Sequence, residues 1–279
     1  MQVCLDNQQM ADIVSSWKDK GKTIAFVPTM GGLHAGHLSL VHQAKANADK
    51  VVVSIFVNPT QFGENEDFDN YPNTLEQDLH ELEACQVDAV FTPNKEHIYP
   101  EGFTSHLKAG SLSQGLCSNA RPGHFDGVVQ VVHRLFEIIT PDIAIFGQKD
   151  YQQLLVIKQM VAVLSLPIQI LSGAIVREQS GLAMSTRNQY LSTEQKQQAL
   201  KLYQVLTELK QEVLNGRNLA TAIQDSKIIL NQDFKIEYLS ALDANTLKSI
   251  TDNTSKIAIL CAVFLGSTRL IDNIIFNQG

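Results

Sequence analysis

Residues 22–57 alternate between apolar runs and a glycine-rich turn in an order that few folds allow. Residues 22–29, KTIAFVPT, form a β-branched and apolar run ending near a proline, the pattern of a strand buried on both faces. A turn with three glycines follows, and residues 35–48 place apolar and small side chains at helical spacing. Residues 50–57 form the next apolar run. Because a helical crossover joins parallel strands, this segment predicts a parallel sheet.

The rest of the first half continues the alternation. Further strands are predicted at residues 89–92, 143–146, 168–171 and 174–176, and helices at residues 74–84, 127–139 and 151–163. Alternation of this kind is typical of the α/β class, and we predict a Rossmann-like doubly wound parallel sheet.

The chain changes character after residue 176, where the polar stretch REQSGLAMSTRNQYLS interrupts the pattern. We therefore predict two domains, residues 1–175 and residues 176–279. The second should be a smaller α+β domain, with an amphipathic helix at residues 193–214 and strands near residues 234–238, 257–265 and 270–276.

Composition limits the possible partners. With 44% hydrophobic and 18% charged residues, the chain of 279 residues can build a real core. Its net charge of -7 argues against general binding to nucleic acid, which needs clustered Lys and Arg. The four cysteines form no C-x-x-C pair, so we expect neither a disulfide framework nor a zinc knuckle but a reducing, cytoplasmic setting. The N-terminus lacks the pattern of a signal peptide and no apolar run could span a bilayer, so no membrane partner is expected.

The turn after the first strand carries two histidines, in the sequence Met30-Gly-Gly-Leu-His34-Ala-Gly-His37. If the helix begins near Gly36, both imidazoles can face one anion at the carboxyl end of a strand, where free amide groups and the helix dipole attract phosphate. Two histidines at this spacing also fit a metal site, although no third ligand stands nearby in a known pattern, and either could simply be structural. Spacing alone leaves these alternatives open.

Five blocks, taken together, resemble one family. Residues 28–37 are similar to the HIGH-type signature of the nucleotidylyltransferase superfamily, in the form that the pantothenate synthetase family carries. Four further blocks follow in that family's order and span most of the chain: Phe56-Val-Asn58-Pro-Thr-Gln61-Phe62, Arg121-Pro-Gly-His-Phe125-Asp-Gly127, Phe146-Gly147-Gln-Lys149-Asp150-Tyr-Gln-Gln153 and Met184-Ser185-Thr186-Arg187-Asn188.

The resemblance implies an AMP-forming ligase that activates pantoate with ATP as an acyl-adenylate and joins it to β-alanine, releasing AMP and pyrophosphate. It also implies Mg²⁺ bound with ATP, through ligands that the sequence does not identify, a homodimer, and a C-terminal domain acting as a lid. The implied catalytic residues are His34, His37, Lys149 and Arg187. The implied ATP-binding residues are Met30, Gly31, Gly32, Leu33, His34, Ala35, Gly36, His37, Gly147, Gln148, Lys149, Asp150, Val176, Met184, Ser185, Thr186 and Arg187.

For the other substrates, the resemblance implies a pantoate site and a β-alanine site that share one glutamine. The pantoate set is Gln61, Gln153, Met30, Val131 and Val132, and the β-alanine set is Gln61 and Asn58. Amide groups suit hydroxyl and carboxylate oxygens. Taken alone, the glutamines are ordinary polar residues, the valines are core residues, and Lys149-Asp150 is a surface pair.

Two positions depart from the family pattern. Thr186 stands where members often carry Ser, which keeps the hydroxyl, and Gln148 stands where many carry Glu, which removes a charge. Rival functions are a different adenylyltransferase on the same scaffold, which should lack the two glutamine-bearing blocks, and a non-catalytic nucleotide-binding regulator. A nicotinamide-dependent dehydrogenase is rejected, because the first turn lacks G-x-G-x-x-G.

Overall fold

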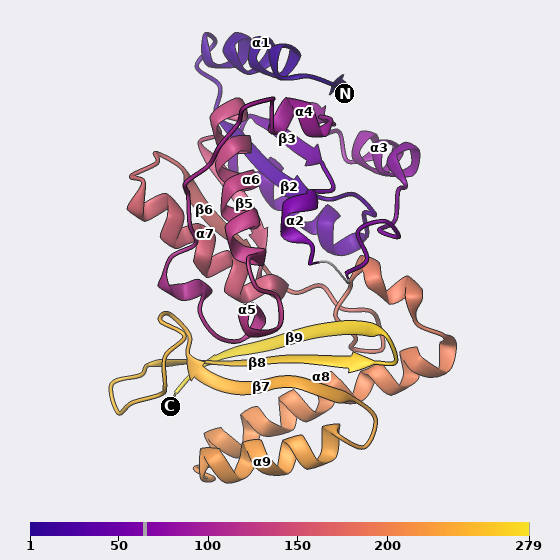
Figure 1. Cartoon of the computed structure of the whole chain (residues 1–279), viewed down its shortest axis with the longest axis vertical. Helices are drawn as coiled ribbons and strands as arrows, with labels where there is room; N and C mark the ends of the chain where they lie inside the picture. The colour runs from indigo at the N-terminus through magenta and orange to yellow at the C-terminus, as the bar shows by residue number, and fades with distance from the viewer. Residues whose placement is uncertain (64–65, 279) are drawn as a thin grey trace. The chain divides into compact units, whose positions relative to one another are not determined.

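The computed structural model describes residues 1–63 and 66–278. The described residues form two compact units, one within residues 1–148 and 152–174 and the other within residues 149–151 and 175–278. The first contains a parallel sheet with helices on both faces, and the second contains a small antiparallel sheet with two α-helices among the described residues (Figure 1). The predicted class, a doubly wound α/β sheet with a smaller α+β region, is confirmed.

The sheet of the first unit has six parallel strands in the order β1-β4-β3-β2-β5-β6. The strands are β1 (Gln2–Cys4), β2 (Ile24–Thr29), β3 (Lys50–Ile55), β4 (Ala89–Phe91), β5 (Ile143–Gly147) and β6 (Gln169–Gly173). The chain moves outward from β2 through β3, then crosses back to place β5 on the other side of β2. The order therefore reverses at β2, and ligands of open α/β sheets bind beyond the carboxyl ends of strands at such a point.

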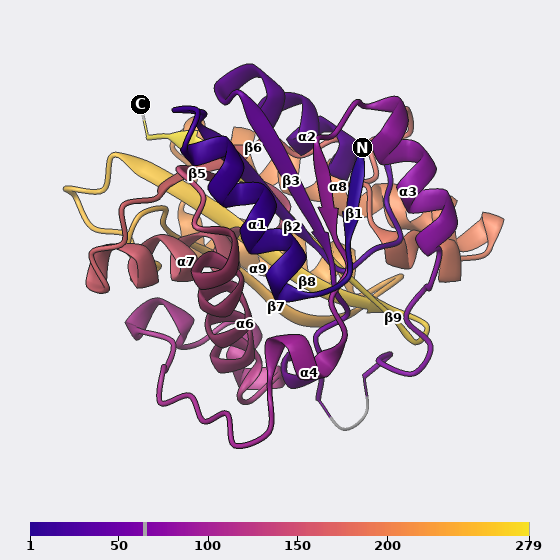
Figure 2. The same cartoon turned by 90° about the horizontal axis from the view of Figure 1, so that it is seen from above.

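Both faces of this sheet are covered, which explains why its strands read as continuous apolar runs. On one face, Val27 and Val53 pack with Val41 of α2 (Ala35–Asn47). On the other, Phe26 meets Phe136 of α6 (His124–Ile139), with ring centroids 6.3 Å apart. Viewed from above, helices flank the strands of this sheet (Figure 2). The helices of this unit are α1 (Asn7–Lys18), α2 (Ala35–Asn47), α3 (Leu75–Ala84), α4 (Lys95–Ile98), α5 (Cys117–Ala120) and α6 (His124–Ile139), with most of α7 (Tyr151–Val163) and the 3-10 turns η1 (Pro59–Gln61), η2 (Ser111–Ser113) and part of η3 (Gln148–Asp150).

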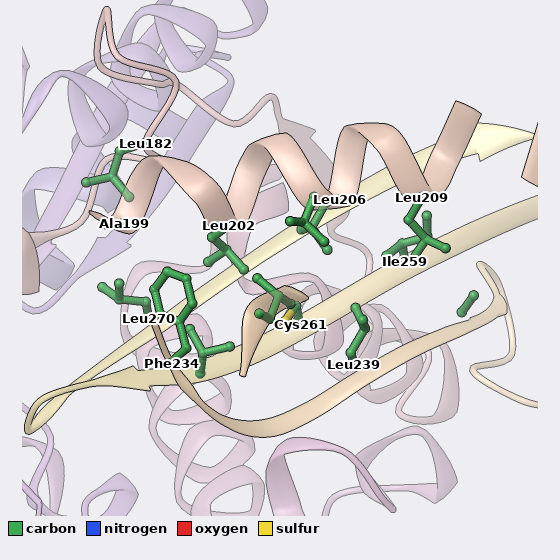
Figure 3. Packing of buried hydrophobic residues seen from close by; sticks show 14 of the residues in the cluster. Leu182, Ala199, Leu202, Leu206, Leu209, Phe234, Leu239, Ile259, Cys261 and Leu270 are labelled. Carbon is green, nitrogen blue, oxygen red and sulfur yellow. The ribbon is translucent and has the colours of Figure 1, made fainter. Parts of the chain in front are cut away.

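The second unit is built on the antiparallel strands β7 (Lys235–Asp243), β8 (Lys256–Leu265) and β9 (Thr268–Asn277). The 3-10 turn η4 (Thr186–Tyr190) precedes α8 (Thr193–Leu214), which begins with a capping box between Ser192 and Gln195, and α9 (Leu219–Leu230) follows. Leu202, Leu206 and Leu209 form the apolar stripe of α8 and point into the core beside β8 (Figure 3). Burying one leucine side chain stabilises a fold by about 1.5–3 kcal/mol, so this stripe is a main attachment of α8 to the sheet.

Five strands and α-helices were not predicted, among them the short helices α4 and α5, and one predicted strand is wrong. The structure also adds β1, α1 and α9, and residues 174–176 are not a strand. The carbonyl of Val176 accepts a hydrogen bond from the amide of Met184 at 3.0 Å, so its polar group is used in a loop rather than in the sheet. An apolar run of three residues carries too little pattern to separate these two outcomes.

Candidate active site

The turn between β2 and α2 lies at the carboxyl end of the central strand. Gly31 and Gly32 have φ angles of 83° and 62°, in the left-handed region that favours glycine. A Cβ atom on Gly31 would lie 3.0 Å from Oδ2 of Asp78 and 3.2 Å from Ile55. Glycine is therefore required at position 31 both for backbone conformation and for the close approach of a buried carboxylate.

Asp78 of α3 fixes this turn, and the sequence analysis missed it. Its side chain is 2% exposed, and its two oxygens accept the amide hydrogens of Gly32 and Leu33, each at 2.9 Å. Thr74 donates to the same carboxylate at 3.1 Å. A signal was present, because Asp78 occupies the buried face of α3 one turn before Leu82, where an apolar residue is expected.

His34 and His37 lie together at the start of α2, with ring centroids 4.1 Å apart. His34 is the N-cap residue, and its Nδ1 accepts the amide hydrogen of Gly36 at 3.1 Å. Since a backbone amide can only donate, Nδ1 is an acceptor, and the neutral ring carries its proton on Nε2. The one N–H donor of the His34 ring therefore lies on Nε2, a type of group that can bind a phosphate oxygen.

The backbone amides of this turn were expected to be free to bind phosphate, but several of them are hydrogen-bonded within the protein. Gly32 and Leu33 donate to Asp78, Gly36 donates to His34, and Gly31 donates to the Thr29 hydroxyl at 3.3 Å. Because these hydrogens already have internal acceptors, these four amides do not form the set of free donors that binds phosphate at many helix N-termini. The glycines shape the turn, and the phosphate-binding role of His34 and His37 stays a prediction.

Gln61 lies at the end of η1 and meets the same turn. Its Nε2 contacts Sδ of Met30 at 2.7 Å, and its Oε1 accepts a hydrogen bond from Nδ2 of Asn58 at 3.3 Å. The structure therefore brings Met30, Asn58 and Gln61, predicted to bind substrate, next to the turn that carries the two histidines. These contacts all lie within the first unit.

The backbone carbonyl of Gln61 accepts hydrogen bonds from the first residue of α6 and from the turn before it. Its carbonyl accepts from Nδ1 of His124 at 2.7 Å and from Arg121 at 3.3 Å, while Nε2 of His124 faces Arg121 at 3.0 Å. A carbonyl only accepts and a guanidinium only donates, so His124 is the neutral tautomer with its proton on Nδ1. Arg121 also forms a two-bond ion pair with Glu66. Burial raises the pKa of Glu66, but the Arg121 hydrogen bond and charge outweigh it and hold that pKa below its ordinary value.

The other predicted pantoate residues lie on α6 and α7. Val131 and Val132 are each 5% exposed and belong to the buried part of α6. Gln152 is buried, with its amide accepting from Cys117 and donating to Leu112, which makes it a structural residue. Its neighbour Gln153 is half-buried, and its pantoate role stays a prediction.

Lys149 follows β5 within η3 and belongs to the second unit, as does β9. Its carbonyl accepts a hydrogen bond from Nδ2 of Asn273 on β9 at 3.0 Å, and the hydroxyl of Tyr151 donates to the carbonyl of Ala244 at 2.9 Å. These two bonds fix the backbone on which the Lys149 and Asp150 side chains stand, and neither partner was found from the sequence.

The segment that bears Arg187 is also tied to β9. Asp272, next to Asn273, forms a two-bond ion pair with Arg177 at 2.7 and 2.9 Å. The same guanidinium donates to the carbonyl of Gly181 and stacks 3.6 Å from the ring centroid of Tyr203. At the other end, Ser185 caps η4 by accepting the amide hydrogen of Arg187 at 3.3 Å. β9 therefore supports both predicted basic segments of this unit.

Residues 1–63 and 66–278 contain no group of three His, Cys, Asp or Glu side chains suited to holding a metal ion. Over the same residues, no helix is long and apolar enough to cross a membrane. The convergence of His37, Lys149 and Arg187 on one ligand stays a prediction.

Residues 2–275 match the family described as Pantoate-beta-alanine ligase. The chain is 57% identical over 279 residues to a pantothenate synthetase of Ruthia magnifica subsp. Calyptogena magnifica, covering 100% of both chains, and 50% identical over 269 residues to that of Shewanella loihica, covering 95% of both. It resembles the crystal structure of pantothenate synthetase from Thermus thermophilus, with a TM-score of 0.93 and 38% identity over 98% of this chain and 99% of that one. It also resembles pantoate-beta-alanine ligase from Francisella tularensis complexed with beta-gamma ATP and beta-alanine, with a TM-score of 0.82 and 35% identity over 99% and 97%.

Proposed function

This chain belongs to the pantoate-beta-alanine ligase family, and we propose on that basis that it condenses pantoate with β-alanine to pantothenate, with cleavage of ATP to AMP and pyrophosphate. The family match over residues 2–275 supports the choice of substrates. The contact between Met30 of the histidine turn and Gln61 supports the choice of site, because it joins the proposed nucleotide and pantoate groups at one end of the sheet.

The chemistry requires activation, because a carboxylate that meets an amine in water only forms a salt. In the proposed first step, a carboxylate oxygen of pantoate attacks the α-phosphorus of ATP and pyrophosphate leaves. In the second, the β-alanine amine attacks the carbonyl carbon, the C–O bond of the mixed anhydride breaks, and AMP leaves with the oxygen that came from pantoate. Neither step needs a covalent enzyme intermediate.

The protein's part is positioning and charge neutralisation. We assign the Nε2–H of His34 and the ring of His37 to the phosphates, together with the ammonium of Lys149 and the guanidinium of Arg187. In this proposal the unit that carries Lys149 and Arg187 acts as a lid that brings both to one triphosphate. Two cations opposite the leaving pyrophosphate suit the charge that develops on it.

For the organic substrates, the Gln61 amide and Gln153 are assigned to pantoate, with Val131 and Val132 against its apolar part. Gln61 and Asn58 are assigned to β-alanine. We place Mg²⁺ on the ATP phosphates with water as its main remaining ligands, which is the usual state of this ion with nucleotides. A cytoplasmic location and a homodimer complete the proposal.

The decisive assay mixes the purified chain with ATP, Mg²⁺ and pantoate whose carboxylate is labelled with ¹⁸O, with and without β-alanine. We expect pantothenate and AMP in equal amounts, and one labelled oxygen in the AMP. Label in inorganic phosphate, with ADP as product, would instead indicate an acyl phosphate. No AMP under any condition would favour a nucleotide-binding regulator, and faster turnover of another acid would favour a different adenylyltransferase.

A second measurement tests the site. Lys149→Ala removes one donor to the phosphates, and the loss of one such group costs about 3–4 kcal/mol of barrier, a few hundredfold in turnover. The matched control is Lys158→Ala, an exposed position on α7. Equal turnover of both variants would remove Lys149 from the mechanism.

A further inference from the structure

The side chain of Asn58 is buried between two parts of the first unit, with only 1% of the residue exposed. Its Oδ1 faces the amide of Thr60 at 3.3 Å, and its Nδ2 faces the carbonyl of Gly127 at 3.3 Å. A backbone amide only donates and a carbonyl only accepts, so these two contacts determine which end of the Asn58 amide is oxygen and which is nitrogen.

This orientation determines that of Gln61 in turn. The atom of Gln61 that meets Nδ2 of Asn58 must be an acceptor, so it is Oε1, and Nε2 is left on the side of Met30. Gln61 therefore presents an N–H donor, not an oxygen, toward the turn of residues 30–37. A donor at this place suits a carboxylate or hydroxyl oxygen of a bound acid.

Tyr99 supplies the shortest contact of Asn58. Its hydroxyl donates to Oδ1 at 2.8 Å, whereas the backbone contacts of Asn58 are 3.3 Å long. Burial raises the pKa of Tyr99, while hydrogen bonds with Thr60 and Asn58 lower it less, so the phenol stays a donor at neutral pH. The ring is held between Phe56 and Phe103, with centroids 6.4 and 5.5 Å away.

We propose that Tyr99 is a positioning residue for the acid substrate: through Asn58 it fixes the Gln61 amide so that Nε2 points to pantoate. This inference rests on the proposed function of the Gln61 site. Tyr99 itself acts through another side chain and needs no contact with substrate.

The packing of η1 shows why a small loss of orientation matters here. A Cβ atom on Gly127 would lie 2.2 Å from the carbonyl oxygen of Thr60 and 2.9 Å from the amide nitrogen of Gln61. The turn is thus pressed against the backbone of α6, so the polypeptide has little freedom and the side-chain amides set the direction of the hydrogen-bond donor. Loss of the Tyr99 hydroxyl removes the shortest hydrogen bond to Oδ1 of Asn58 and leaves only those from the hydroxyl and amide of Thr60, at 3.0 and 3.3 Å.

The test is a double-mutant cycle of Tyr99→Phe and Gln61→Ala, read as kcat/KM for pantoate by AMP formation from labelled ATP, which detects slow variants. We expect Tyr99→Phe alone to raise the KM for pantoate about three- to tenfold, the effect of one neutral hydrogen bond. The KM for ATP should stay within about twofold. In the Gln61→Ala background, Tyr99→Phe should change nothing further.

Tyr203→Phe is the matched control, because it removes a hydroxyl from a ring in the second unit while leaving the surface stacked by Arg177. It should leave the KM for pantoate unchanged. An equal effect of Tyr99→Phe in both backgrounds, or an equal rise in the KM values for ATP and pantoate, would show a general effect on the fold and overturn the proposal. Failure of the proposed function is read separately, since the parent chain would then form no AMP with pantoate.

Discussion

Asp78→Asn tests whether a buried carboxylate shapes the histidine turn. The carboxylate accepts one amide hydrogen on each oxygen, from Gly32 and Leu33, so an asparagine can satisfy only one of them and turns an NH₂ group toward the other. Hydrogen bonds to charged groups contribute about 1.5–3 kcal/mol each. We therefore expect the free energy of unfolding to fall by about 1.5–3 kcal/mol, or the melting temperature by about 3–12 °C.

Activity should fall as well, because the same turn carries His34 and His37. A displacement of about 1 Å in a catalytic group can lower the rate by up to a hundredfold, so we expect kcat to fall about ten- to a hundredfold. The measurements are thermal unfolding and the steady-state rate of AMP formation. Asp12→Asn is the matched control, because Asp12 is exposed on α1 and its carboxylate accepts a hydrogen bond from the equally exposed side chain of Gln8.

Two results would refute this reasoning about Asp78. One is a melting temperature equal to that of Asp12→Asn, which would mean that the two amides find other acceptors at no cost. The other is reduced stability with normal kcat at a temperature where the variant is folded, which would mean that the turn keeps its shape without the carboxylate.

Four further predictions concern other residues of the chain. His37→Ala should lower kcat a few hundredfold, about 3–4 kcal/mol, whereas the exposed His42→Ala on the same helix should not, as measured by AMP formation. Gly127→Ala should raise the KM for pantoate and lower stability by about 1–3 kcal/mol, because its Cβ meets the η1 carbonyl; an unchanged KM would contradict the close packing. Asn273→Ala should lower kcat/KM for ATP about three- to tenfold by releasing the Lys149 carbonyl, with the KM for pantoate as the internal reference. The ion pair with Arg121 lowers the pKa of Glu66 against the effect of burial. The stability that this pair contributes is therefore complete above the ordinary pKa of 4.5 and is lost as pH falls through the lower pKa of the folded state. The melting temperatures of the parent and of Glu66→Gln should converge only in acid.

The central strand and its turn could be read from the sequence because their signals are local. The apolar run of β2, the glycines after it and the helical spacing of α2 lie within a continuous segment, and the predicted helix start near Gly36 is close to the observed start at Ala35. α1 and α9 had readable signals too, namely N-cap residues Asp6 and Asn218 before apolar positions at helical spacing, and they were missed. β1 has three residues and its pairing with β4 leaves no local pattern.

The residues that hold the backbone of the candidate site in place, such as Asp78 and Asn273, could not be predicted in the same way. Asp78 lies 46 residues from Gly32, and Asn273 lies 124 residues from Lys149, so their roles depend on contacts that only the folded chain creates. The five sequence blocks named the groups that the family resemblance implies at the substrates, and their contact with substrate stays a prediction. Buried acceptors and donors behind them are constrained only by the neighbouring backbone, which a single sequence does not show.

Asp272 and Asn273, which are adjacent on β9, hold two different segments of the second unit in place. Successive side chains of a strand point to opposite faces, and on β9 Asp272 bonds to Arg177 while Asn273 bonds to the backbone of Lys149. The register of β9 against β8 therefore sets the spacing between two basic segments that are far apart in the chain. A register shift of one residue would exchange the two faces of β9 and break both the Asp272–Arg177 and the Asn273–Lys149 bonds. Inserting or deleting one residue in the turn at residues 265–268 should therefore lower activity strongly, although that turn carries none of the proposed ligand-binding groups.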